Sequence, residues 1–315
     1  MLNRRHLRIK VLQMLYSYFN DEDSTDISLA EKNLLNSIER IYDLYIYLLL
    51  SFPVVREVAL NKQDERKKKL RPTKEDLYPN LKFVDNKIIS LITNSVDLNQ
   101  LSENRKINWD NDEKREIYRK IFIEIEKSEV YFEHMNNDEK GFEADRNFLI
   151  QLFKAEIANS PLIYDFFEDE DIHWMDDIDL ACSMVIKTIK NTKEDKFDIM
   201  PLYKANDDEK AFICTLLKET IKKDAENELM IENLVENWEF ERIAKMDVLL
   251  LKMAITELQC FEKIPTKVSI NEYIEISKYY STPKSNVFIN GILDKSVNLL
   301  SKENKINKSG RGLIQ

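Results

Sequence analysis

Residues that break helices are unusually scarce in this sequence. Only four glycines and seven prolines occur among 315 residues, while residues that favour helices are abundant. No sustained alternation of apolar and polar residues marks a strand, and the Asn290-Gly291 pair, which can mark a hairpin, lies inside a helical pattern. The sequence therefore predicts an all-α protein, long enough to bury a sizeable core in one domain or two.

The most regular helical pattern lies in residues 264–300. The first half carries apolar residues at helical spacing, namely Val268, Ile270, Tyr273, Ile274 and Ile276. Pro283 ends this helix because proline has no amide hydrogen, and Ser285 or Asn286 can cap a second helix. The apolar residues of that second helix are Phe288, Ile289, Ile292, Leu293, Val297 and Leu300. We expect two short helices joined by a tight turn at the end of a helical bundle.

This region also resembles a known family. The run KVSINEYIEISK (residues 267–278), followed by FINGILD (288–294), resembles the C-terminal signature of the NusB family of transcription antitermination factors. The runs WEFER (238–242) and MDVLLLKMAITEL (246–258) extend the resemblance. At the other end of the chain, RRHLR (4–8) with VLQMLY (11–16) is similar to the family's arginine-rich first helix.

The resemblance implies a fold and a domain organisation. It implies a NusB-like helical bundle of two packed sub-bundles, with residues 1–20 and 206–300 as the RNA-binding core. Residues 21–205 lie outside the resemblance and are predicted to be a mostly helical insert that enlarges the N-terminal sub-bundle. Residues 301–315 are predicted to be a disordered tail. The first helix, from about residue 3 to 19, should pack on the C-terminal bundle, because its apolar stripe needs a cover.

The resemblance also implies a function and a set of site residues. A NusB-like factor binds the boxA element of nascent ribosomal RNA together with the ribosomal protein NusE, and the complex joins RNA polymerase and suppresses termination. The implied RNA-binding residues are Arg4, Arg5, Arg8, Tyr16, Lys284, Asn286 and Phe288. Lys284 stands where the family often has an acid. Asp247 matches an acid offered to the ribosomal protein, and an ion pair with Lys245 or Arg242 is the alternative.

The spacing of the first arginines supports this interpretation. Arg4 and Arg8 are four residues apart and project from nearly the same side as the apolar stripe of their helix. We expect that they cannot sit in the core, so that this end of the helix extends past the bundle and meets phosphates bidentately. A solvated helix end is the simpler alternative.

Charge is distributed unevenly along a chain whose formal net charge is −10. A net negative charge argues against a protein that binds nucleic acid through its overall charge. It is compatible with a small basic surface that contacts RNA locally. Residues 66–74 form a basic run, which is either a second nucleic-acid patch or a flexible solvated linker. Residues 165–179 hold eight acids and no Lys or Arg. They are either a surface for a basic partner or a solubilising loop.

The predicted insert contains large apolar residues that require burial. They are Tyr42, Tyr45, Ile46, Phe122, Tyr131, Phe148, Phe153, Phe166 and Trp174. A long helix is expected after residue 23, running to about residue 69, with a kink or break at Pro53. Residues 148–154 also align with 212–218 at an offset of 64, which pairs Trp174 with Trp238 and suggests an internal repeat.

Several classes of protein are disfavoured by what the sequence lacks. No phosphate-binding loop, zinc-protease, serine-hydrolase or Cys-x-x-Cys motif is present, and three cysteines and three histidines are scattered. We therefore predict a cytoplasmic binding protein without metal or cofactor, not an enzyme and not in a membrane. A protein-interaction scaffold without RNA binding, or the RNA-binding portion of an rRNA-modifying system, remains open. The oligomeric state also remains open, a homodimer included.

Overall fold

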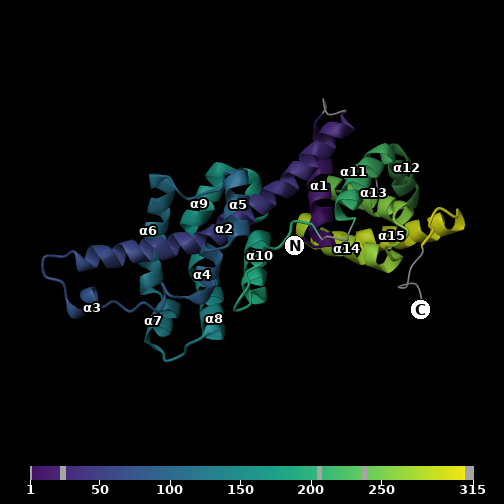
Figure 1. Cartoon of the computed structure of the whole chain (residues 1–315). Helices are drawn as coiled ribbons and strands as arrows, with labels where there is room; N and C mark the ends of the chain where they lie inside the picture. The colour runs from purple at the N-terminus through teal and green to yellow at the C-terminus, as the bar shows by residue number, and fades with distance from the viewer. Residues whose placement is uncertain (1, 22–25, 204–207, 236–239, 309–315) are drawn as a thin grey trace. The chain divides into compact units, whose positions relative to one another are not determined.

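The computed structural model of the chain describes residues 2–21, 26–203, 208–235 and 240–308. Within these ranges the regular structure is helical (Figure 1). The only strand-like pairing there is an isolated bridge between Lys193 and Lys196. The prediction of an all-α protein is confirmed.

Contacts between residues divide the chain into two compact units. Unit 1 consists of residues 1–38 and 203–315, and unit 2 of residues 39–202. The helices of unit 1 are α1 (Arg4–Asn20), α11 (Glu209–Lys222), α12 (Asp224–Leu234), α13 (Lys245–Cys260), α14 (Thr266–Tyr280) and α15 (Ser285–Lys302). The predicted boundaries between core and insert, at residues 20 and 206, stay a prediction.

Helix α13 lies at the centre of unit 1. It packs against α1, α11, α12, α14 and α15, and its Leu250 and Ile255 side chains are fully buried. Helix α1 packs against α11, α13 and α14, where its apolar stripe of Leu7, Val11 and Leu15 is buried. The prediction that the first helix packs on the C-terminal helices is therefore confirmed.

A long helix, α2 (Ile27–Lys67), begins in unit 1 and continues into unit 2. Asp26 caps its start, since the Oδ1 atom accepts hydrogen bonds from the amides of Ser28 at 2.8 Å and Leu29 at 3.2 Å. Pro53 was expected to kink or break the helix; it does not break it, since the helix continues to Lys67, and a kink there stays a prediction. The loss of one hydrogen bond at a proline is offset here by burial of the neighbouring Phe52 and Val55.

The other helices of unit 2 surround an aromatic core. They are α3 (Lys74–Leu77), α4 (Lys87–Thr93), α5 (Val96–Arg105), α6 (Asp112–Lys127), α7 (Glu129–Asn136), α8 (Phe142–Leu152), α9 (Pro161–Glu170) and α10 (Ile178–Asn191). Of the large residues predicted to be buried, Tyr131 and Phe166 are half-buried and the other seven are buried. Trp174 donates a hydrogen bond from Nε1 to the Arg40 carbonyl of α2 at 3.0 Å.

The suggested internal repeat pairs Trp174 with Trp238, and the structures around these two tryptophans cannot be compared. Trp238 lies outside the described residues. The segment 148–154 spans the end of α8 and the start of a π-helical turn, Phe153–Ile157, whereas 212–218 lies inside α11. The repeat stays a hypothesis.

A buried histidine on α7 makes unit 2 sensitive to acid. The His134 side chain is 4% exposed, and its ring stacks on Phe148 with 3.6 Å between ring centroids. Burial, with a smaller contribution from the Lys82 charge, lowers the pKa of His134 to about 4. The ordinary histidine pKa is about 6.5, so the unfolded chain binds this proton at a higher pH than the folded chain does.

We expect His134 to reduce stability as the pH falls through the window from about 6.5 to about 4, by at most roughly 1.4 kcal/mol per pH unit. The His134→Phe variant keeps the stacking and should lose this part of the pH dependence. Urea unfolding at a series of pH values measures the effect. His173→Gln is the matched control, because the His173 side chain is 75% exposed. Parallel pH profiles for the parent and His134→Phe would contradict the assignment.

Candidate nucleic-acid interface

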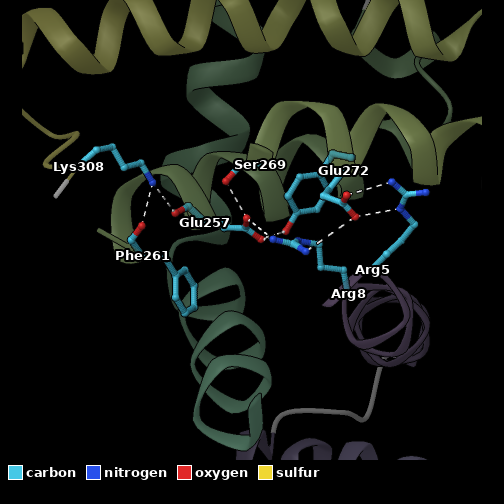
Figure 2. A network of polar contacts seen from close by, with 8 residues as sticks. Arg5, Arg8, Glu257, Phe261, Ser269, Glu272 and Lys308 are labelled. Carbon is cyan, nitrogen blue, oxygen red and sulfur yellow. Dashed lines mark hydrogen bonds and ion pairs between the residues drawn. The ribbon is translucent and has the colours of Figure 1, made fainter. Parts of the chain in front are cut away.

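Arg8 forms a buried ion pair inside unit 1. Its side chain is 1% exposed, and Nε and Nη2 donate to the Glu257 carboxylate at 2.7 and 2.6 Å. Figure 2 shows Arg8 of α1 directed at Glu257 of α13. Ser269 and Tyr273 of α14 also donate to Glu257, at 2.7 and 2.9 Å. The expectation that Arg8 cannot sit in the core is wrong, because a buried carboxylate supplies a matching bidentate partner.

The electrostatics of this network keep Arg8 charged and the Tyr273 phenol protonated. Burial opposes the charge of Arg8, yet the hydrogen bonds and charge of Glu257 raise the pKa of Arg8 above its ordinary value. Burial, reinforced by the Glu257 carboxylate, raises the pKa of Tyr273 well above its ordinary value, so the phenol stays a donor. The Arg8 guanidinium also lies 5.2 Å from the Phe212 ring centroid. Arg8 therefore fixes α1 in place, and its guanidinium is occupied by Glu257, although Arg8 also belongs to the lining of the hollow described next.

Arg4 and Arg5 lie nearer the surface, at a cationic hollow beside the start of α1. The hollow measures about 410 Å³, and its lining includes Arg4, Arg5, Lys263, Pro265, Val268 and Glu272. Arg5 is 38% exposed and donates through Nε and Nη2 to the Glu272 carboxylate, both at 2.9 Å. Arg4 is half-buried, with its guanidinium 5.5 Å from the Phe212 ring centroid. Lys263, which the sequence interpretation missed, adds an exposed cation from the turn before α14.

A second hollow lies at the turn between α14 and α15. It measures about 700 Å³ and is lined by Arg242, Ile243, Ala244, Asp247, Thr282, Lys284, Ser285, Val287 and Phe288. The structure thus brings together Lys284, which is exposed, and Phe288, which is half-buried, as predicted from their place in the sequence. Asn286 is half-buried and does not line this hollow. Arg242 is exposed and adds a second cation that the sequence interpretation treated only as a possible partner of Asp247.

Asp247 points into the protein and holds this turn together. It is 5% exposed, and its carboxylate accepts hydrogen bonds from the hydroxyls of Ser281 at 2.5 Å and Ser285 at 2.6 Å. The suggestion that Asp247 faces a protein partner does not fit this burial. The alternative, an ion pair with Lys245 or Arg242, is replaced by the two serine hydroxyls. Through these two hydrogen bonds, Asp247 of α13 holds the turn that leads into the Lys284–Phe288 segment.

Tyr16 lies in a different setting from the other predicted RNA ligands. Its side chain is 45% exposed and lines a hollow of about 380 Å³ with Phe19, Ile243, Val248, Asp224, Glu228 and Lys252. The Lys252 ammonium donates to Asp224 at 2.7 Å and to Glu228. Ile243 lines both this hollow and the Phe288 hollow. The two carboxylates of this hollow are matched by Lys252 and Lys245, so the lining has no excess positive charge to attract a phosphate backbone.

The segment that follows α15 contacts the end of α13 in unit 1. Residues 301–308 of the predicted tail are described, and α15 extends to Lys302. Figure 2 shows the Lys308 ammonium at the end of α13, where it donates to the carbonyls of Phe261 at 3.0 Å and Glu257 at 3.4 Å. A cation at a helix C-terminus complements the helix dipole. Residues 309–315 lie outside the described part.

The acidic stretch 165–179 belongs to unit 2, at the end of α9 and the start of α10. Several of its charges are used inside that unit: Asp171 pairs with Arg40 at 2.7 Å and accepts a hydrogen bond from His173, and Glu170 lies 3.8 Å from Lys114. Asp177 is buried. These contacts favour a structural and solubilising role, while binding of a basic partner stays a prediction.

Two further properties concern metal and membrane. Among the described residues, no group of three or more His, Cys, Asp or Glu side chains is arranged to hold a metal ion. The described helices also include none with an apolar stretch long enough to cross a bilayer.

Matches with known proteins fall in the C-terminal part of the chain. Residues 178–298 match the NusB family, so the resemblance is confirmed for this part of the chain. The match begins with α10, which the contacts place in unit 2, and it does not include α1. No solved structure matches the chain.

Three similar proteins are each named transcription antitermination protein NusB. The protein from Salinibacter ruber is 50% identical over 99 residues, that from Chloroherpeton thalassium 40% over 117, and that from Natranaerobius thermophilus 42% over 91. The aligned segments cover 31%, 37% and 29% of this chain. They span 62%, 54% and 66% of the relatives, which is less than two thirds of each.

We expect Glu257→Gln to lower the free energy of unfolding by about 3–5 kcal/mol, because it leaves Arg8 buried without a counter-charge. Chemical denaturation measures the loss. The matched control is Glu219→Gln, which breaks a 2.9 Å surface pair with Lys222 and should cost less than about 1 kcal/mol. Equal losses in the two variants would show that the buried pair does not hold α1.

Proposed function

We propose that this protein is a transcription antitermination factor that binds boxA-type single-stranded RNA in nascent ribosomal RNA. It binds this RNA together with the ribosomal protein NusE, in a complex with RNA polymerase. We propose that it acts in the cytoplasm as a binding protein and not as an enzyme. The NusB family domain supports the general assignment. The observation that carries the RNA-binding part is the hollow at the α14–α15 turn, which is lined by Phe288 together with the cations Lys284 and Arg242.

The chemistry of this hollow suits a single-stranded base. An aromatic ring can stack any base, and neighbouring cations attract the phosphates on either side. The Asp247 hydrogen bonds fix the turn before RNA arrives, so little ordering is required on binding. Lys284 is also the N-cap residue of α15, where the helix dipole favours an anion. We propose this hollow as the base-stacking end of the site.

The cationic hollow at α1 supplies the other end of the proposed site. Val268 in that hollow and Thr282 in the Phe288 hollow are separated by nearly the whole of α14, roughly 20 Å at 1.5 Å per residue. Tyr279, between them on α14, is 82% exposed and offers a further ring for stacking. We propose that RNA lies along α14, with phosphates at Arg4, Arg5 and Lys263.

Acidic residues on α14 do not oppose this path strongly. Glu272 is neutralised by Arg5 at 2.9 Å, and Glu275 pairs with Lys278. The hydrogen bonds that Arg5 donates to the Glu272 carboxylate raise the pKa of Arg5, so this arginine keeps its charge. Arg8 is left out of the proposed RNA-binding set because its guanidinium is occupied by Glu257 in the core.

We propose that the Tyr16 hollow receives the protein partner. Tyr16 and Phe19 are exposed aromatic residues, and Ile243 and Val248 add apolar surface to the lining. The lining also holds two carboxylates, Asp224 and Glu228, and two lysines, Lys245 and Lys252. Exposed aromatic rings among apolar residues and charges of both signs fit a protein surface such as that of a ribosomal protein. This assignment moves Tyr16 from the RNA-binding residues to the partner-binding residues.

For RNA, we expect Phe288→Ala to weaken binding of a boxA-type oligonucleotide by about 1–3 kcal/mol with an unchanged salt dependence. Arg4→Gln should reduce the slope of log affinity against log salt by about 0.7, since one phosphate contact is lost. Fluorescence titration at several salt concentrations measures both effects. Leu229→Ala, at an exposed apolar position on α12, is the control and should bind as the parent does. If all variants bind alike, the RNA site lies elsewhere.

For the partner, we expect Tyr16→Ala to weaken binding of NusE by at least about 1 kcal/mol, as removal of a central interface aromatic does. Affinity for RNA alone should stay unchanged. Isothermal titration with NusE, and separately with RNA, measures the two affinities. Loss of RNA affinity with intact NusE binding would return Tyr16 to the RNA-binding residues.

A further inference from the structure

The basic run of unit 2 has a defined structure. Its six cations are Arg66, Lys67, Lys68, Lys69, Arg71 and Lys74. The run covers the end of α2, a turn, and the start of α3. Thr73 and Asp76 form a capping box: the Asp76 amide donates to Thr73 Oγ1 at 3.1 Å, and the Thr73 amide donates to Asp76 Oδ2 at 2.9 Å. The structure therefore gives the run a fixed turn in place of the linker considered from the sequence.

Half of these cations have carboxylate partners and half do not. Arg66 pairs with Glu126 at 3.1 Å, Lys67 with Asp64 at 3.2 Å, and Lys69 with Asp76 at 2.8 Å. Lys68, Arg71 and Lys74 are exposed, and no carboxylate of the described chain lies within ion-pair distance of them. These three residues give the turn positive charge that forms no ion pair with the carboxylates of the described residues.

An open hollow with exposed aromatic rings lies at the same end of α2. It measures about 620 Å³, and its lining includes Gln63, Arg66, Tyr78, Phe122, Tyr131 and Phe132. Phe122 is 3% exposed and lies at its base, whereas Tyr78 is 77% and Phe132 65% exposed. The carboxylate of Glu126 in the hollow is neutralised by Lys62 and Arg66. Two large exposed rings thus line this hollow, and the Tyr78 amide donates to the carbonyl of Lys74, in the cationic turn, at 2.9 Å.

We propose that this face of unit 2, the platform formed by Tyr78 and Phe132 with Lys68, Arg71 and Lys74, binds single-stranded nucleic acid. Exposed rings stack bases of any sequence, and the three cations contact the phosphates. Amide side chains of the hollow, such as Gln63, can pair with base edges. The platform lies outside the residues matched to the NusB family and is separate from the site proposed on unit 1.

An acidic peptide is the competing occupant, and the lining argues against it. A peptide held by apolar anchors needs a groove with mainly apolar walls. Here the amides of Gln63, Asn80 and Asn136 line the hollow together with the rings. Flat rings at the rim with polar groups between them suit planar bases, which carry donors and acceptors on their edges. The test below includes the acidic peptide as a separate arm.

The experiment titrates the full chain with labelled oligouridylate and oligoadenylate at several salt concentrations. Both the parent and a background carrying Arg4→Gln and Phe288→Ala are used, so that the unit 1 site is weakened independently. In that background, adding Tyr78→Ala and Phe132→Ala should lower affinity by about 5- to 100-fold per ring that stacks a base. The triple change of Lys68, Arg71 and Lys74 to Gln should reduce the salt slope by about 2.

Matched controls come from the exposed face of α6. Ile123→Ala is the control for the removed rings, because the Ile123 side chain is a large apolar group that is 44% exposed. The triple change of Arg119, Lys120 and Lys127 to Gln removes the same charge from a surface away from the hollow lining. Both should leave affinity and salt slope as in the background. Circular dichroism checks that every variant is folded.

Three results would overturn the proposal. The first is equal affinity and equal salt slope for the platform variants and the α6 controls, whatever the unit 1 changes do. The second is binding of oligoglutamate that depends on the platform residues while oligonucleotide binding does not. The third is loss of binding from the unit 1 changes alone, which would support the proposed boxA site and count against the platform.

Discussion

The bidentate pair between Arg8 and Glu257 is the interaction on which unit 1 depends. It joins α1 to α13 across 249 positions of sequence, and Ser269 and Tyr273 of α14 complete the coordination of the same carboxylate. A buried ion pair stabilises only when its remaining hydrogen-bonding capacity is satisfied. The neighbouring hydroxyls do this, so three helices share one polar centre inside an apolar core.

The proposed RNA path follows from that centre. Because Arg8 fixes α1 against α14, Arg4 and Arg5 are placed at the edge of the same helix that carries Glu272 and Tyr279. At the other end of α14, Asp247 of α13 holds the turn that leads to Phe288. Helix α13 thus supplies a buried carboxylate near each end, and each one positions a different part of the proposed surface.

Apolar periodicity and scarce glycine predicted the kind of fold, because both are local properties that packing does not override here. The pairing of the first helix with the C-terminal helices was instead implied by the resemblance to the NusB family and by the apolar stripe of that helix. The sequence could not predict which arginine is buried. Arg4 and Arg8 have the same chemistry and lie on similar sides of α1, and only the distant Glu257 distinguishes them. Asp247 was misjudged for the same reason, since its serine donors lie 34 and 38 positions away. The turn residue Lys263 belongs to no motif, and only the approach of α1 reveals its place in the cationic hollow.

The serine pair that holds Asp247 also restricts how this part of the sequence can diverge. Replacing either serine alone removes a donor from a buried carboxylate, and replacing the aspartate alone removes the acceptor that Ser281 and Ser285 share. Each single change costs stability that a second change must restore, so the three positions are coupled in evolution. Lys284, exposed between the two serines, is free of that coupling. A lineage can therefore retune the charge of this turn by one substitution while its backbone stays the same.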